Sequence, residues 1–150
     1  MKFFNQTMIT WILIRIAVRD WKEQRIPNAD IAILFCFCAL QLLAVSGQME
    51  KGVFLYALFG ACSASGILLL TVFLVPGAFG GGDIKLMAAA GILLGPVKSL
   101  HSLAAAIFLC GICILAGMAG GKIRRDSVIA FGPFLCAGIL YHLWSTAILK

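Results

Sequence analysis

Charged residues are scarce in this chain, and acidic ones are the scarcest. Lys, Arg, Asp and Glu make up 12% of the 150 residues, whereas an ordinary soluble domain has about 25%. Apolar residues account for 62% of the sequence, so we predict a polytopic membrane protein rather than a soluble domain. The net charge of +6 does not predict a nucleic-acid partner, because the cations flank apolar runs, where they orient helices in a bilayer.

No polar stretch is long enough to form a separate soluble domain. At about 20 residues per crossing, the length accommodates roughly six helices. We therefore predict an all-α fold of six transmembrane helices that forms one domain, 1–150. The predicted helices are 4–18, 29–45, 53–75, 83–94, 99–117 and 128–149. Arg15 interrupts the first apolar run and no small-residue cleavage site follows it, so we expect this helix to be retained.

The six cysteines lie inside apolar runs and lack the arrangement of a zinc site. Cys110 and Cys113 form a C-x-x-C pair, but a second pair that would complete four ligands does not occur. We interpret the cysteines as small packing residues, with metal or redox chemistry as the alternative. The sequence thus predicts neither a metal nor another cofactor.

Asp83 stands where a glycine-rich stretch, Gly80, Gly81 and Gly82, meets an apolar helix. A charged side chain costs roughly 2.5–3.5 kcal/mol at the centre of a membrane helix and less near the interface, so such a residue is a candidate for function. The alternative is that Asp83 only stabilises the N-terminus of its helix through the helix dipole.

The distribution of cations predicts the orientation in the membrane. The loops after the first, third and fifth predicted helices contain seven: Arg19, Lys22, Arg25, Lys85, Lys122, Arg124 and Arg125. The opposite side contains four: Lys2, Lys51, Lys98 and Lys150. The excess predicts that these loops are cytoplasmic and that both termini lie outside. Asp20, in the first of these loops, is then on the same membrane face as Asp83.

Two carboxylates held close together cannot easily both ionise, so one keeps a proton and the pair can act as acid and base together. Such a pair hydrolyses a peptide bond without a metal or a nucleophilic side chain. The glycines before Asp83 have no Cβ atoms, which lets an extended substrate come near. The alternative for Asp20 is a surface charge beside Arg19 and Lys22.

Three segments resemble the motifs of the type IV prepilin peptidases, which are GxGD membrane aspartyl proteases. They are Asp20 with Ile26-Pro27-Asn28, Gly80-Gly81-Gly82-Asp83 with Lys85, and Phe131-Gly132-Pro133. The segments occur in the family's order and span nearly the whole chain. The resemblance implies that Asp20 and Asp83 are the catalytic pair and that cleavage requires no metal.

The resemblance also implies a substrate and a location. The substrate would be a prepilin-like precursor, of type IV pilin, pseudopilin or archaellin type, whose short basic leader is cut at the cytoplasmic face of a prokaryotic cell membrane. Long members of the family carry a domain with paired C-x-x-C zinc ligands near the N-terminus and methylate the new terminus. This chain has no such insertion between its first two predicted helices, so we expect peptidase activity without methyl transfer.

Several alternatives stay open at this point. A proton-coupled transporter or channel would use the acidic pair as a relay, and a structural subunit of a pilus or secretion machine would have lost activity. Lys85 would either tune the ionisation of Asp83 or extend to the interface. Arg15 and Arg19 would contact Asp20 or lipid phosphate. Gly132 and Pro133 are expected to kink or open the sixth helix. The oligomeric state is not predicted.

Overall fold

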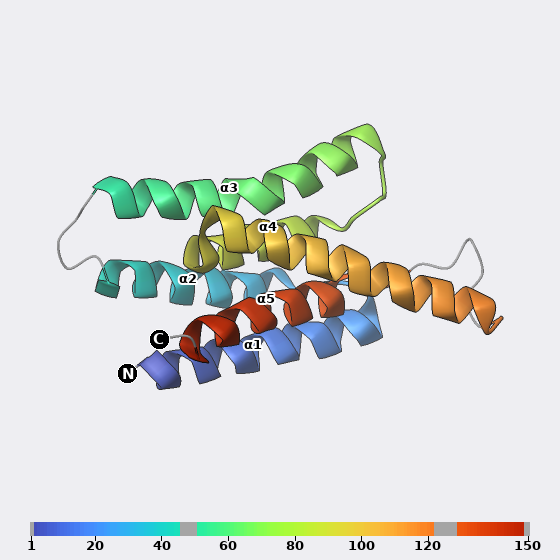
Figure 1. Ribbon diagram of the computed structural model, residues 1–150, viewed down its shortest axis with the longest axis horizontal. Helices are drawn as coiled ribbons and strands as arrows, with labels where there is room; N and C mark the ends of the chain where they lie inside the picture. The colour runs from blue at the N-terminus through green and yellow to red at the C-terminus, as the bar shows by residue number, and fades with distance from the viewer. Residues whose placement is uncertain (1, 46–50, 122–128, 149–150) are drawn as a thin grey trace.

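The protein, described here from a computed structural model, is an all-α bundle (Figure 1). The structure describes residues 2–45, 51–121 and 129–148. In these residues it has five helices: α1 (Lys2–Glu23), α2 (Asn28–Val45), α3 (Lys51–Leu74), α4 (Gly81–Ala119) and α5 (Gly132–Ile148). The predicted all-α class is therefore confirmed. Helix α4 packs against α2, α3 and α5, and α1 packs against α5 and α2.

Helix α4 is broken at Gly95. The backbone there has φ 74° and ψ 175°, a conformation that residues with a Cβ rarely adopt. Pro96 follows and has no N–H to continue the helical hydrogen bonds. The structure assigns one helix across this break, whereas we predicted two, 83–94 and 99–117. The predicted boundary coincides with the break, but the structure assigns five helices to the described residues rather than six.

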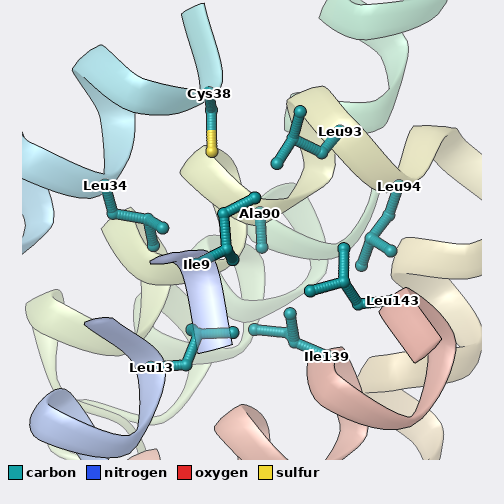
Figure 2. Close-up of a pocket in the computed structure, with 9 residues that line it drawn as sticks. All are labelled: Ile9, Leu13, Leu34, Cys38, Ala90, Leu93, Leu94, Ile139 and Leu143. Carbon is teal, nitrogen blue, oxygen red and sulfur yellow. The ribbon is translucent and has the colours of Figure 1, made fainter. Parts of the chain in front are cut away.

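The two parts of α4 run in opposite directions (Figure 1). Leu94, just before the break, shares a small apolar gap with Leu143 near the end of α5 (Figure 2). Ser102, after the break, donates a hydrogen bond to the carbonyl of Gly138, nearer the start of α5, at 3.2 Å. The first part of α4 therefore runs toward the C-terminal end of α5, and after Gly95 the second part runs back toward the start of α5. The gap itself measures about 10 Å³ and is lined by apolar side chains and Cys38, so it offers no acid–base chemistry.

Helices α3 and α4 approach each other closely at glycines. A Cβ atom placed on Gly60 would lie 2.2 Å from the carbonyl oxygen of Gly91, and one placed on Gly91 would lie 2.2 Å from the oxygen of Gly60. The contact continues at Gly95, where a Cβ would overlap the ring of Tyr56. Glycine is required at these positions because backbone packs directly on backbone, as in many membrane helix pairs.

Two helices are long and apolar enough to cross a membrane. They are the segment Gly52–Leu74 of α3 and the segment Gly81–Ala119, which is α4 with its break at Gly95. In the most apolar part of each helix, only 22% and 17% of the residues are buried. Exposed side chains include Phe54, Phe59 and Phe73 on α3 and Phe108 on α4. A mostly exposed apolar helix differs from the buried core helix of a soluble protein, so this surface is consistent with a membrane protein.

Two predicted helix ends are wrong. We expected the first helix to end at Val18, but α1 continues to Glu23, so Asp20 belongs to its last turns rather than to a loop. We expected Gly132 and Pro133 to kink a helix that starts at 128, but residues 129–131 are not helical and α5 begins at Gly132. Proline suits this place, because the first-turn N–H groups of a helix have no partner within it.

The glycine contact between α3 and α4 predicts opposite effects for two alanine substitutions on one helix. Gly60→Ala should destabilise the protein by roughly 1–3 kcal/mol, because backbone must move to admit the methyl group. Gly66→Ala, where a Cβ meets nothing within 4 Å, should be neutral or stabilising by up to about 1 kcal/mol. Thermal unfolding in detergent measures both, and equal effects would contradict the assigned contact.

Candidate active site

A cavity of about 440 Å³ opens where three loops and helix ends meet. Its lining comes from residues 20 and 24–26 at the end of α1, from 77–83 before and within the start of α4, and from 129–131 before α5. Asp20 and Asp83 both line it. The cavity thus brings together two carboxylates that are distant in the sequence.

Asp20 is held by the first residue of α5. The N–H of Gly132 donates a hydrogen bond to Oδ2 of Asp20 at 2.9 Å, and the aspartate is only 5% exposed. A Cβ on residue 132 would lie 2.6 Å from the same oxygen, so only glycine allows this approach. The start of a helix presents unpaired N–H groups and a partial positive charge, which suits an acidic side chain.

Asp83 lies in the first turn of α4 and bonds back to the glycine loop. Its Oδ2 accepts the N–H of Gly80 at 3.2 Å, and its own N–H donates to the carbonyl of Gly80 at 3.1 Å. Asp83 therefore does stabilise the N-terminus of α4, which is the role that we gave as the alternative to catalysis. Oδ1 of Asp83 is nevertheless buried and has no hydrogen-bond partner among the residues that the structure describes. Such an atom is costly to bury unless water or substrate bonds to it.

The two carboxyl groups interact with each other and are shielded from solvent. Both line the same cavity, and their exposed fractions are 5% for Asp20 and 7% for Asp83. For Asp20, which lies outside the two candidate membrane spans, burial raises the pKa above its ordinary value, and the hydrogen bond from Gly132 offsets part of that rise. A pair of this kind favours one shared proton over two charges.

The three glycines before Asp83 have different surroundings. At Gly82 a Cβ would lie 2.9 Å from Cβ of Ile26, so glycine is needed there to let the loop pack on the segment after α1. At Gly81 a Cβ would meet nothing within 4 Å, and the residue is exposed at the cavity. The loop is also held by Phe79, whose ring lies 4.8 Å from that of Phe131. Our sequence analysis did not single out Phe79.

Lys85 contacts the Ile26-Pro27-Asn28 segment through Asn28. Nζ of Lys85 donates to Oδ1 of Asn28 at 3.0 Å, which ties the start of α4 to the start of α2. The carbonyl of Pro27 accepts the N–H groups of Asp30 and Ile31, so Pro27 begins the hydrogen bonding of α2. Lys85 lies outside the cavity lining and contacts α2, and the two roles that we weighed for it stay predictions.

Asp30 is a buried carboxylate that sequence reasoning missed. It forms ion pairs with Arg19 at 3.0 Å and Arg15 at 3.5 Å. The two arginines thus contact Asp30, and the expected contact with Asp20 is not among those of the described residues. Acidic and basic residues in neighbouring helices of a membrane protein are the signal that could have indicated this pairing.

The comparisons with known proteins agree with the motifs in this cavity. The sequence matches the type IV leader peptidase family over residues 7–115, which is most of the chain. The chain belongs to the type IV leader peptidase family. The matched residues include Asp20, Asp83 and the glycine loop between α3 and α4, whereas Gly132 lies beyond them.

Relatives of this chain include proteins from two bacteria. The chain is 36% identical to a "Prepilin leader peptidase/N-methyltransferase" of Bacillus subtilis (strain 168), over 100% of this chain and 59% of that protein. It is 30% identical to a protein of the same name from Aeromonas salmonicida (strain A449), over 95% of this chain and 50% of that protein. The chain therefore spans little more than half the length of these relatives. No solved structure gives a significant match.

The cysteines of this family member are divided between interior and surface. Cys38 and Cys136 are buried, whereas Cys36, Cys62 and Cys113 are exposed on apolar helices, and all six are free thiols. In the described part of the chain, no group of three or more His, Cys, Asp or Glu residues is placed to hold a metal ion. Our interpretation of the cysteines as packing residues therefore fits Cys38 and Cys136, which are buried, but not the three that are exposed.

The raised pKa of Asp20 predicts how an Asp20→Asn substitution affects stability. A carboxyl with a raised pKa stabilises the fold fully below its unfolded pKa, and this contribution is lost as the pH rises through the folded pKa. Asn keeps an oxygen that can accept from Gly132 but carries no charge. Asp20→Asn should therefore unfold at a higher temperature than wild type at pH 7, and the difference should shrink on acidification. A difference that grows as the pH falls would contradict this prediction.

Proposed function

We propose that this chain is a membrane aspartyl endopeptidase that cleaves the short basic leader from prepilin-like precursors, with Asp20 and Asp83 as its catalytic pair. The observation that carries the proposal is the meeting of these two buried carboxylates in one cavity, each bonded to a backbone N–H of a neighbouring segment. Membership of the type IV leader peptidase family supports cleavage of prepilin leaders as the reaction.

The proposed reaction uses one proton shared by the pair. The ionised carboxylate takes a proton from a water molecule as that water attacks the scissile carbonyl, while the protonated carboxyl donates its proton to the carbonyl oxygen. Hydrogen bonds from Gly132 and Gly80 each occupy one oxygen, so the unpartnered Oδ1 of Asp83 is an atom to which water or substrate can bond. The buried position strengthens these interactions, because little solvent screens them.

The substrate would reach the pair along the glycine loop. Gly80 and Gly81 are exposed at the cavity. The N–H and the carbonyl of Gly80 already bond to Asp83, so a substrate in an extended conformation would pair its main chain with that of Gly81. A basic leader is attracted by two carboxylates. Precursors of type IV pilin, pseudopilin or archaellin type are all compatible with this arrangement, so we propose prepilin-like proteins as the substrate class.

We further propose that the site faces the cytoplasm and that both termini lie outside. The excess of Lys and Arg that the sequence places on the side of Asp20 and Asp83 supports this orientation, with Arg19, Lys22 and Lys85 in the ends of α1 and α4 and Lys122, Arg124 and Arg125 outside the described residues. We also propose cleavage without N-methylation. The link from α1 to α2 consists only of residues 24–27, which leaves no inserted domain between them.

Substitution of either aspartate tests the proposed reaction. In liposomes with a panel of prepilin-like precursors, Asp20→Asn and Asp83→Asn should each lower the cleavage rate by roughly 10²–10⁴-fold, because each removes one partner of the acid–base pair. Glu23→Gln, at an exposed carboxylate outside the cavity lining, should keep the wild-type turnover number.

A chelator should leave cleavage unchanged, and no methyl group should be transferred to the product in the presence of a methyl donor. Cleavage that survives both aspartate substitutions would refute the paired mechanism. Proton flux without cleavage would favour the transporter alternative, and loss of pilus assembly without either activity would favour the structural subunit.

The glycine loop gives a second, independent test. Gly81→Ala should leave the unfolding temperature unchanged or slightly higher but raise the KM, because the new methyl group occupies open space that the substrate needs. Gly82→Ala should instead lower stability, since its methyl group would press on Ile26. If Gly81→Ala cleaves with wild-type kinetics, the substrate does not approach along this loop.

A further inference from the structure

We infer that Arg15, Arg19 and Asp30 form a binding site for the phosphate of an anionic phospholipid. Asp30 is almost fully buried, with 4% of its side chain exposed, whereas the side chains of Arg15 and Arg19 are 47% and 41% exposed. The three residues join α1 to α2 and lie outside the lining of the cavity that contains Asp20 and Asp83. This site does not depend on the proposed peptidase reaction.

Each guanidinium group has more N–H donors than its ion pair with Asp30 uses. Nη1 of Arg19 binds Oδ2 of Asp30 at 3.0 Å, and Nη2 of Arg15 binds Oδ1 at 3.5 Å, so each arginine uses one oxygen. A guanidinium has five N–H donors, and the exposed fractions show that part of each arginine side chain reaches the surface. The shared carboxylate therefore holds two arginines side by side before any ligand arrives.

The charges of the cluster favour an anion. Two arginines against one aspartate leave one positive charge, and paired guanidinium groups bind phosphate oxygens in a bidentate manner. Pre-organisation matters here, because two long side chains that are already fixed lose less freedom when the phosphate binds.

The surroundings favour a lipid over a free phosphate. Ile14 and Val18 flank Arg15 on the surface of α1 and are 49% and 50% exposed, and Ile33, one turn after Asp30 on α2, is 52% exposed. An acyl chain can cover these side chains while the head group binds the arginines. Arg19 directly precedes Asp20 in α1, so the head group would lie at the same end of this helix as the cavity.

The test compares unfolding temperatures of the full chain in phosphatidylcholine nanodiscs with and without phosphatidylglycerol. Wild type should be stabilised by phosphatidylglycerol. The triple variant Arg15→Gln/Arg19→Gln/Asp30→Asn should lose most of that increase, while its amide groups can still bond to one another. Lys22→Gln is the matched control, because it changes the net charge by the same single unit on the same helix and should keep the increase.

Equal increases in wild type and the triple variant would overturn the inference, as would a loss of the same size in Lys22→Gln. Soluble glycerol phosphate, added at matched concentration in detergent, should have little effect, and an increase equal to that of the lipid would show that the source is a free phosphate.

A labelling experiment on wild type avoids any dependence on variant folding. Phosphatidylglycerol with a photoreactive head group should attach near residues 14–19 and 30–33, and attachment confined to other segments would refute the site.

Discussion

The hydrogen bond from the N–H of Gly132 to Asp20 is the interaction on which the candidate site depends. It joins the last turns of α1 to the first turn of α5, across 112 positions in the sequence. Only glycine allows the approach, because a Cβ at residue 132 would overlap the carboxylate. The same contact buries Asp20 and brings residues 129–131 to the cavity wall, where Phe131 holds Phe79 and with it the glycine loop.

The position of Asp83 depends on a second close contact, between α3 and α4. Gly60 and Gly91 let the two backbones touch, and the break at Gly95 turns the second part of α4 back along α5. Helix α4 packs against α2, α3 and α5, and Asp83 at its N-terminus lines the same cavity as Asp20. Small residues thus determine where both carboxylates lie, although they carry no chemistry themselves.

Much of this arrangement could be predicted from the sequence because it follows local patterns. The apolar runs indicated α2 and α3 to within two residues, and Gly95 and Pro96 indicated the break. The distribution of cations predicted that Asp20 and Asp83 lie at the same end of the helices, and both line one cavity. The predicted end of the first helix was wrong. Hydropathy predicted a loop after Val18, but the helix continues through the polar residues up to Glu23.

Features that depend on contacts between distant segments could not be predicted. No local pattern shows that the N–H of Gly132 bonds to Asp20, or that Asp30 pairs with two arginines of the preceding helix. The roles of the three glycines in the loop could not be predicted either, because nothing in the sequence distinguishes one from another. The structure separates Gly82, which packs on Ile26, from Gly81, which faces open space.

The central claim is that Asp20 and Asp83 act as one unit on the reacting carbonyl. The most direct measurement is the affinity for a leader-spanning peptide in which a hydroxyl-bearing, non-cleavable group replaces the scissile bond. This group imitates the tetrahedral species, so wild type should bind it roughly 10²-fold more tightly than the same peptide with a group that lacks the hydroxyl. Either Asp→Asn variant should lose that preference. Equal affinity for both peptides in wild type, or a preference that persists in either variant, would contradict the account.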